Sequence, residues 1–200
     1  MERFRRTLAE EGIVVLHGDD MPIDDETWHS IDRSIRLLPF EEVRIGDAGD
    51  RHKVRVSRLV NDPDVPTFLQ PQAQAIVAAV MGERMMALCR EALGLPACCV
   101  RRGQAHLLSE GGFIGYHLDQ DSNPDYHYAL VLHFSHGFTG GELVAHHPTK
   151  GRRAYQPAPR SILINRGDIP HEVAPVEQGE RMTLALFLSD NFGPRSLPRR

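Results

Sequence analysis

The sequence predicts an α+β protein with a mainly β core, in which a β-barrel or jelly roll carries helices packed against one sheet. Two observations point to this class. From residue 98 onward, short apolar runs alternate with Gly, Pro and Asp turns, a pattern typical of an antiparallel sandwich or barrel. Before residue 98, long stretches without helix breakers favour helices. With 200 residues, 41% of them hydrophobic and 25% charged, the chain can form one sizeable core, so we expect a single domain over 1–200.

The N-terminal part, residues 1–97, is expected to support the barrel and to be rich in helix. Residues 2–11 are charged and lack breakers, which predicts a helix. The β-branched run 13–16 predicts a strand. Acidic residues at 24–26 favour the start of a second helix, because the helix dipole attracts negative charge to its N-terminus. The apolar face of this second helix would consist of Trp28, Ile31, Ile35 and Leu38.

Two further elements are expected before the barrel strands. Residues 51–60 alternate in part between polar and apolar side chains, which predicts a strand. Residues 71–93 are rich in Ala and Met and predict one long helix, ended by a glycine and a proline. The β core would span 98–190, with strands at 98–108, 114–119, 127–135, 141–147, 152–156, 161–165, 171–176 and 181–189. The Pro- and Arg-rich tail, 191–200, is expected to be flexible.

The charge balance gives the protein a slightly acidic character. Lys and Arg number 23 and Asp and Glu 27, a formal net charge of −4. A dedicated nucleic-acid binder usually carries a basic excess, so we expect no nucleic-acid partner. The basic pairs at 101–102 and 152–153 are interpreted as solvated surface. The alternative is that they frame the mouth of a pocket for an anionic substrate.

The cysteines indicate a reducing compartment. Cys89, Cys98 and Cys99 are few, odd in number and without regular spacing, so they do not form a disulfide framework. The apolar run 13–16 is too short for the core of a signal peptide, and no stretch approaches the ~20 apolar residues that cross a bilayer. We therefore expect a cytoplasmic protein without a membrane partner.

A candidate metal site begins in the segment 115–119. On a strand, residues i and i+2 share a face, so His117 and Asp119 would project together. His171, which follows a turn, is the best candidate for a third ligand. Two histidines and one carboxylate form the facial triad of non-heme Fe(II) oxygenases. A His-x-Asp tripeptide alone is a weak signal, and a lone strand histidine is more often structural.

Arg181 strengthens the metal interpretation. It begins the otherwise apolar run 181–187, and an arginine there is costly to bury without an anionic partner. A dicarboxylate cosubstrate would be such a partner, held by the guanidinium fork. Thr183 would share the face of Arg181 and could add a hydroxyl donor. The alternative is a surface arginine just outside the strand.

Residues 104–189 resemble the catalytic core of the Fe(II)/2-oxoglutarate-dependent dioxygenases, in their prolyl-4-hydroxylase-like branch. The order and spacing of four segments carry this resemblance. They are Gly115-Tyr116-His117-Leu118-Asp119, Gly140-Gly141-Glu142-Leu143, Pro170-His171-Glu172-Val173-Ala174-Pro175-Val176 and Gly179-Glu180-Arg181-Met182-Thr183-Leu184.

The resemblance implies a double-stranded β-helix, which is a jelly-roll, cupin-like fold. It implies that His117, Asp119 and His171 are the catalytic Fe(II) ligands, and that Arg181 and Thr183 bind the distal carboxylate of the cosubstrate 2-oxoglutarate. With dioxygen, such an enzyme hydroxylates an unactivated C–H bond and releases succinate and CO2. Related halogenases have a small residue at the carboxylate position, so Asp119 favours hydroxylation over halogenation.

One position departs from the family pattern. Many relatives have a tyrosine nine residues before the first ligand, where it contacts the cosubstrate, and here that position is Leu108. The residues that could substitute for this tyrosine are Gln104, His106, Tyr128 and His133.

The expected substrate is a small molecule such as a free amino acid or a biosynthetic intermediate, because the chain is compact, mildly acidic and without an evident docking module. The first alternative is a peptidyl or protein hydroxylase of the same superfamily. Two others are a cupin-like metal enzyme that does not need Arg181, and a non-catalytic jelly-roll binding module. The polar loop 120–126 either contacts substrate or is plain surface.

Overall fold

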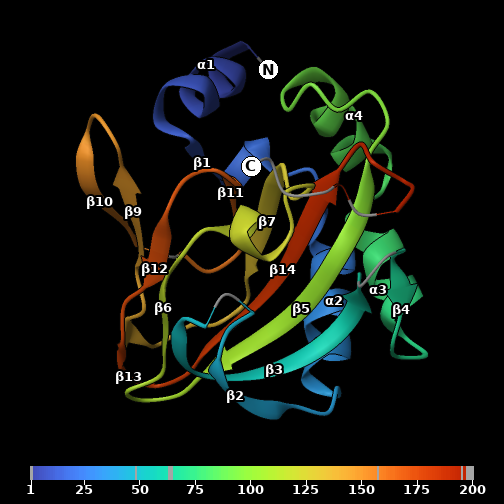
Figure 1. Cartoon of the computed structure of the whole chain (residues 1–200). Helices are drawn as coiled ribbons and strands as arrows, with labels where there is room; N and C mark the ends of the chain where they lie inside the picture. Colours follow the sequence, from blue (N-terminus) through green and yellow to red (C-terminus); the bar gives the residue numbers. More distant parts are fainter. Residues whose placement is uncertain (1, 48, 63–64, 157, 195, 197–200) are drawn as a thin grey trace.

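The computed structural model describes residues 2–47, 49–62, 65–156, 158–194 and 196, and Figure 1 shows how the elements are arranged. The helices are α1 (Glu2–Glu11), the 3-10 helix η1 (Gly18–Asp20), α2 (Asp25–Arg36), α3 (Ala73–Val80), α4 (Glu83–Glu91) and α5 (Asp119–Ser122). The strands of the first half are β1 (Ile13–Leu16), β2 (Glu41–Ile45), β3 (Arg51–Asn61) and β4 (Thr67–Phe68). The later strands are β5 (Cys99–Leu108), β6 (Phe113–His117), β7 (Tyr128–His133), β8 (Thr139–Gly140), β9 (Leu143–His147), β10 (Gly151–Tyr155), β11 (Ser161–Arg166), β12 (His171–Val173), β13 (Val176–Gln178) and β14 (Arg181–Ser189).

A curled antiparallel sheet dominates the molecule (Figure 1). Its strands follow the order β1-β11-β7-β14-β5-β3-β6-β12-β9-β10, and β2 and β4 pair with β3. Strand β3 serves both halves of the sheet, because His52 near its start pairs with β6 whereas Arg58 pairs with β5. The sheet therefore folds over into two facing layers, and the predicted jelly-roll fold is confirmed.

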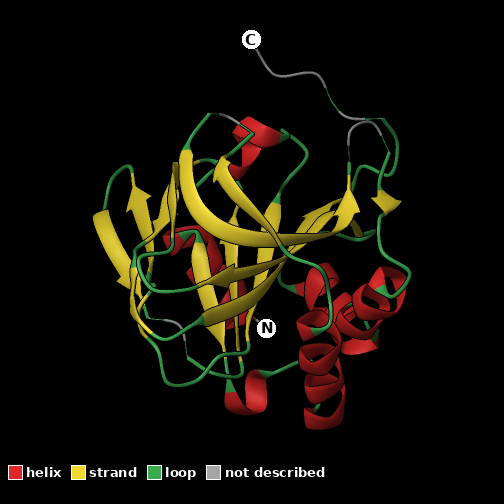
Figure 2. Ribbon diagram, turned by 90° about the horizontal axis from the view of Figure 1, so that it is seen from below, coloured by secondary structure: helices red, strands yellow, loops and turns green. Residues whose placement is uncertain are grey.

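Alternation along the strands separates a helix-covered face from a cavity-lining face. On β14, Met182, Leu184 and Leu186 belong to the main hydrophobic core together with residues of α2, α3 and α4. Arg181 and Thr183 of the same strand line the cavity between the two layers. Figure 2 shows a group of helices lying against one side of the sheet. The expected packing of helices on one sheet is thus confirmed.

Some predicted boundaries are wrong. The helix expected over 71–93 is two helices, because Gly82 adopts an extended conformation (ψ 175°) and begins α4. The strand expected over 114–119 ends at His117, and the next residues turn into α5. The strand expected over 171–176 divides into β12 and β13. Strands β2, β4 and β8 were not predicted, since β2 is almost wholly exposed and polar and the other two are very short.

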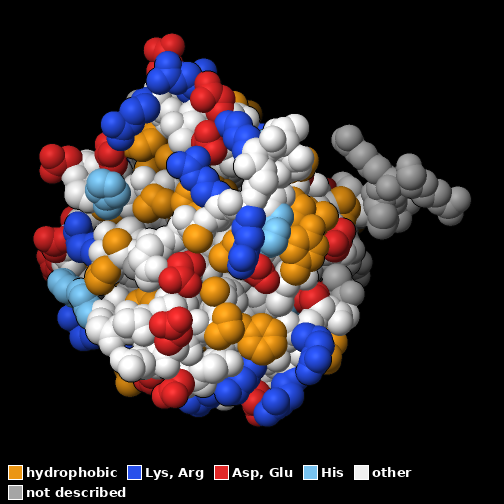
Figure 3. Space-filling view, turned by 90° about the vertical axis from the view of Figure 1, so that its left-hand side faces the viewer, with side chains coloured by type: hydrophobic (Ala, Val, Ile, Leu, Met, Phe, Trp, Pro, Cys, Tyr) orange, Lys and Arg blue, Asp and Glu red, His pale blue; other side chains and the backbone are white. Residues whose placement is uncertain are grey.

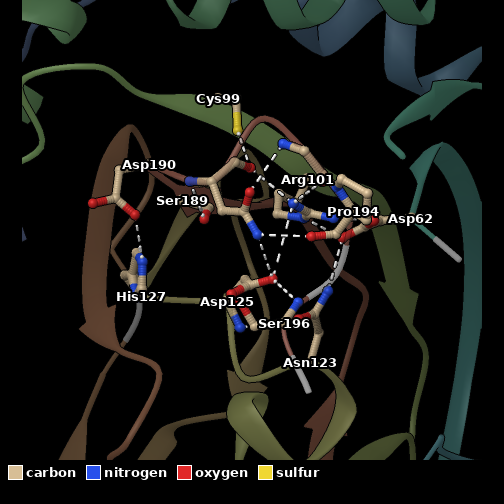
Figure 4. Close-up of polar contacts among 12 residues, drawn as sticks. Asp62, Cys99, Arg101, Asn123, Asp125, His127, Ser189, Asp190, Pro194 and Ser196 are labelled. Atoms are coloured by element: carbon tan, nitrogen blue, oxygen red, sulfur yellow. Dashed lines mark hydrogen bonds and ion pairs between the residues drawn. The ribbon is translucent and has the colours of Figure 1, made fainter. Parts of the chain in front are cut away.

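A buried polar network surrounds Arg101 at one end of β5 (Figure 4). Its Nε and Nη2 donate to the carboxylate of Asp62, at 2.5 and 2.7 Å. Its Nη1 donates to the backbone carbonyls of Asn191 and Gly193, at 2.8 and 3.0 Å. The interpretation of Arg101 as solvated surface is wrong, because its side chain is fully buried.

The same network anchors the loop that follows Asp119. Asn123 Nδ2 donates to Asp62 Oδ2 at 2.8 Å, and Asp125 Oδ2 accepts from the backbone N–H of Ser196 at 2.7 Å. Of the tail predicted to be flexible, residues 195 and 197–200 lie outside the described residues. The described part of that tail is tied to the loop and to β5.

Candidate active site

The pairing of β6 with β12 brings the predicted metal-ligating side chains together. His117 at the end of β6 lies directly opposite His171 at the start of β12, and their ring centroids are 4.4 Å apart. Asp119, the first residue of α5, places Oδ1 at 3.5 Å from His117 Nε2 and 3.8 Å from His171 Nε2. The three ligand atoms lie within 4.8 Å of one another. The structure therefore groups all three predicted residues, although Asp119 lies beyond the strand rather than on it.

Hydrogen bonds behind the three side chains fix their orientation. His117 Nδ1 donates to the carbonyl of Gly115 at 2.8 Å, and His171 Nδ1 donates to the carbonyl of Ile169 at 2.9 Å. A carbonyl oxygen only accepts, so Nδ1 carries a proton in both rings. Nε2 of each ring faces Asp119 Oδ1 and is the nitrogen available to a metal ion. Such backing is typical of histidines that ligate a metal.

Asn165 of β11 is a site residue that the sequence did not reveal. It is fully buried, and its Nδ2 donates to Asp119 Oδ2 at 3.1 Å. This bond occupies one carboxylate oxygen and leaves Oδ1 for the shared point between the histidines. No motif marked Asn165, since only the pairing of β11 within the sheet brings it to Asp119.

The protonation states suit a divalent cation. Burial alone would raise the pKa of the Asp119 carboxyl, but the neighbouring His171, His117 and Asn165 more than offset it and hold this pKa below its usual range. Burial lowers the pKa of His171. Burial would also lower the pKa of His117, but the hydrogen bond and charge of Asp119 more than offset this and raise it. The group therefore combines one carboxylate with two imidazoles, which are the donor types of a non-heme Fe(II) site.

Arg181 lies deeper in the same cavity without a counter-ion. Its side chain is 2% exposed, and burial lowers its pKa to about 10, so it stays charged at neutral pH. Among the described residues, no carboxylate forms an ion pair with it, and its Nε has no hydrogen-bond partner. A buried cation without a partner is costly, and the cavity that it faces is where an anion would compensate it.

Two histidines lie beside Thr183 on the neighbouring strands, two residues along the sheet from Arg181. Thr183 pairs with His106 of β5 on one side and with His133 of β7 on the other. The hydroxyl of Thr183 and both ring nitrogens of His133 have no partner among the described residues. Burial, and then the charge of Arg181, holds the pKa of His133 well below its ordinary value. This row offers uncharged polar groups beside the Arg181 cation.

The four residues considered as substitutes for the missing tyrosine are now separated by position. His106 and His133 lie beside Thr183, close to Arg181. Gln104 lines the cavity two residues further along β5. Tyr128 packs against the helix-covered core on the other face of β7. Leu108 belongs to a separate apolar cluster and does not line the cavity.

The Gly140-Gly141 pair makes room for Arg181. Both glycines have positive φ, 71° and 68°, which L side chains rarely adopt. A Cβ atom on Gly141 would lie 2.9 Å from Arg181 Cδ. This glycine motif therefore shapes the cradle in which the Arg181 side chain lies.

Two histidines and an aspartate face one point in the jelly-roll cavity. The same cavity contains a buried arginine that has no carboxylate partner among the described residues. This combination is typical of a non-heme metal enzyme of the facial-triad class. The family described as the 2OG-Fe(II) oxygenase superfamily matches residues 103–189. An oxidoreductase of the 2OG-Fe(II) oxygenase family from Burkholderia pseudomallei is 30% identical, with 96% of this chain and 92% of that chain covered and a TM-score of 0.88. The chain belongs to the 2OG-Fe(II) oxygenase family, whose members use Fe(II) and 2-oxoglutarate.

Other solved structures share the fold at lower identity. A prolyl-4-hydroxylase from Pseudomonas putida is 19% identical, with 94% of this chain and 97% of that chain covered and a TM-score of 0.65. HygX from Streptomyces hygroscopicus, with nickel and 2-oxoglutarate bound, is 11% identical, with 96% and 88% covered and a TM-score of 0.69. No curated protein matches the chain by sequence. In the described ranges, no helix has the length and apolar character needed to cross a membrane.

Proposed function

We propose that this oxygenase hydroxylates an unactivated C–H bond of a small molecule, such as a free amino acid or a biosynthetic intermediate, and releases succinate and CO2. One observation carries the cosubstrate assignment. Arg181 is a buried cation that has no counter-ion within the described part of the chain, and it faces the cavity that contains the His117, Asp119 and His171 cluster. A dicarboxylate would neutralise this cation and still reach a metal ion at the cluster.

The residue roles follow from the geometry. His117 and His171 would ligate Fe(II) through Nε2 and Asp119 through Oδ1, because these atoms share one point while hydrogen bonds occupy their other polar atoms. Arg181 and the Thr183 hydroxyl would hold the distal carboxylate of 2-oxoglutarate. When bound, iron and 2-oxoglutarate together supply the activation of dioxygen that C–H hydroxylation needs.

His133 is the residue that we propose in place of the missing tyrosine. Its ring is buried beside Thr183, and neither nitrogen has a partner among the described residues. A neutral imidazole keeps one N–H donor, which suits a carboxylate oxygen held by the neighbouring Arg181. The chain's contribution is thus to bind and orient the cosubstrate in a pocket shielded from water.

The surface and the charge balance favour a small substrate over a nucleic acid. The formal net charge is −4. Figure 3 shows acidic, basic and apolar side chains interspersed over the face on the side of β9 and β10. A nucleic-acid interface would instead concentrate positive charge. The cavity between the layers is therefore the binding surface on which the proposal rests.

We also propose a cytoplasmic location, on the basis of the cysteines. Cys89, Cys98 and Cys99 are all free thiols in the structure. Proteins of oxidising compartments usually pair their cysteines. A fusion to a fluorescent protein, imaged in the source cells, tests this location.

The test of the cosubstrate site is an anaerobic titration of the Fe(II)-loaded protein with 2-oxoglutarate, followed by the visible charge-transfer band of the chelate. We expect a saturable band in the wild type. Arg181→Gln should weaken the apparent affinity for 2-oxoglutarate by about 100-fold, because a charge-assisted, bidentate contact is lost. Arg152→Gln is the matched control, since Arg152 is an exposed arginine on β10.

Three results would count against the proposal. Bound iron without a band would favour a cupin-like metal enzyme. An unchanged iron affinity in His117→Ala would remove His117 from the site and favour a non-catalytic binding module. Succinate release that depends on peptides and on none of the free small molecules would establish a peptidyl hydroxylase instead.

A further inference from the structure

A second arginine, Arg102, lies in the cavity far from Arg181. On the paired strands β5 and β14, Arg102 is opposite Phe187, whereas Arg181 is opposite Leu108. The two pairs are six residue steps apart, which corresponds to about 20 Å along the strands. Both arginines line the same cavity. Arg58 of β3, which pairs with Gln104, lines the cavity as well. The sheet therefore presents Arg181 near one end of its cavity-lining face, and Arg102 and Arg58 toward the other.

Arg102 lies in the same row of the sheet as the residue that positions the metal-site carboxylate. Arg102 pairs with Phe187, Phe187 with Ala129, and Ala129 with Asn165, which donates to Asp119. Three strand spacings separate Arg102 from Asn165, about 14 Å between backbones. The long Arg102 side chain and the Asp119 carboxylate enter this interval from its two sides. Both side chains line the same cavity.

The surroundings of Arg102 resemble an occupied anion site. Its side chain is only 15% exposed, and its carboxylate partner is Asp47 on the turn between β2 and β3, 53% exposed. The side-chain amide of Gln104 lies beside the guanidinium. In the amide orientation that satisfies both neighbours, Oε1 accepts from Arg102 Nε at 2.8 Å and Nε2 donates to His106 Nε2 at 3.1 Å. The interpretation of Arg102 as solvated surface is therefore wrong.

We propose that Arg102 binds a carboxylate of the substrate, which takes the place of Asp47 on the guanidinium. The substrate class is a compact organic acid, including free amino acids, held by its carboxylate at one end while a carbon atom faces the metal site. A guanidinium fork matches a carboxylate in geometry and charge. Asp47 is the group to be displaced, because it is half exposed and comes from a surface turn. This inference rests on the proposed function.

A purely structural role for the Arg102–Asp47 pair makes a different prediction. If the pair only fixed the turn between β2 and β3, removing the Asp47 charge would loosen the turn and would not improve ligand binding. If Asp47 instead competes with the substrate, Asp47→Asn should tighten binding. The sign of the Asp47→Asn effect thus distinguishes the two roles.

The experiment uses the anaerobic protein saturated with Fe(II) and 2-oxoglutarate. Each of the twenty L-amino acids and a panel of short hydroxy acids and keto acids is titrated by calorimetry, together with the corresponding amides. We expect at least one acid to bind and its amide to bind at least about tenfold more weakly. Arg102→Gln should raise the Kd of that acid by about 10- to 100-fold, and Asp47→Asn should lower it. Arg44→Gln, an exposed arginine of β2 paired with Glu42, should change nothing.

The controls separate this inference from the cosubstrate assignment. In every variant the chelate band and the affinity for 2-oxoglutarate should stay as in the wild type, because Arg102 lies far from Arg181. Loss of the band in the wild type would overturn the proposed function itself. With the band intact, the inference is overturned if no acid binds, if the amides bind equally well, or if Arg102→Gln leaves the Kd unchanged.

Discussion

The two oxygens of the Asp119 carboxylate have different surroundings. Oδ2 accepts from the buried amide of Asn165, and Oδ1 faces both histidines. Asn165→Ala should free the carboxylate to rotate and should weaken Fe(II) binding by about 10- to 100-fold. Competition titration with a coloured chelator measures this affinity.

A second buried asparagine serves as the control for this prediction. Asn123 is equally buried, but it donates to Asp62 rather than to the metal site. Asn123→Ala should lower the stability and leave the iron affinity of the folded protein unchanged. Equal losses of iron affinity in both variants would mean that Asn165 acts only through general destabilisation.

His133 makes a separate prediction at the residue scale. Its pKa in the folded protein is well below 6.5 because of burial and the charge of Arg181. The unfolded chain therefore binds a proton as the pH falls through about 6.5, whereas the folded chain does not, and stability is lost toward acid. For this group the loss is at most about 1.4 kcal/mol per pH unit.

Urea unfolding of the metal-free protein between pH 7 and 5 tests the role of His133. His133→Leu should reduce the slope of the free energy of unfolding against pH by up to about 1.4 kcal/mol per pH unit. Its absolute stability is not the readout, since the leucine also changes the packing. Parallel curves for the wild type and the variant would contradict the prediction.

Among the structural elements, the turn before β9 determines where the Arg181 side chain can lie. Gly141→Ala would place a Cβ 2.9 Å from Arg181 Cδ, at a φ of +68°. We expect a roughly tenfold weaker affinity for 2-oxoglutarate, besides about 1 kcal/mol of backbone strain. The chelate titration and thermal unfolding measure these two effects.

A control variant at Gly151 distinguishes the effect of backbone strain from the effect of displacing the Arg181 side chain. Its φ is also positive, +75°, but no atom lies within 4 Å of the position of an added Cβ. Gly151→Ala should therefore cost similar stability and leave the affinity for 2-oxoglutarate unchanged. If both alanine variants bind 2-oxoglutarate as the wild type does, the cradle has no role in placing Arg181.

The sequence predicted the strands of the core better than their connections. The run 181–189 is a strand, with Arg181 and Thr183 on one face, because alternation and apolar character are local properties. The single helix over 71–93 was wrong, because the backbone leaves the helical conformation at Met81 and Gly82. Asn165 could not be recognised as a site residue, because cross-strand register and not sequence spacing brings it to the cavity. Arg102 was considered only as the alternative in which a basic pair frames a pocket, and the structure places it in the cavity lining.

At the scale of the whole molecule, the network around Arg101 joins β5, Asp62 directly after β3, the loop after Asp119 and the end of the described chain (Figure 4). Removing one partner of a buried ion pair leaves the other charge uncompensated. Asp62→Ala should therefore lower the free energy of unfolding by about 3–5 kcal/mol. Urea denaturation measures this loss, and a change below about 1 kcal/mol would show that the network contributes little.

Two neighbouring arginines of β5 lie on opposite faces of the strand. The side chain of Arg101 is buried in the polar network, and that of Arg102 lines the cavity. We therefore expect substitutions at position 102 to leave the contacts of Arg101 in place. In a directed-evolution experiment, saturation libraries at 102 and 47 should yield folded enzymes with new substrate preferences, whereas libraries at 101 should yield mostly insoluble chains. The sheet thus makes substrate choice evolvable independently of folding.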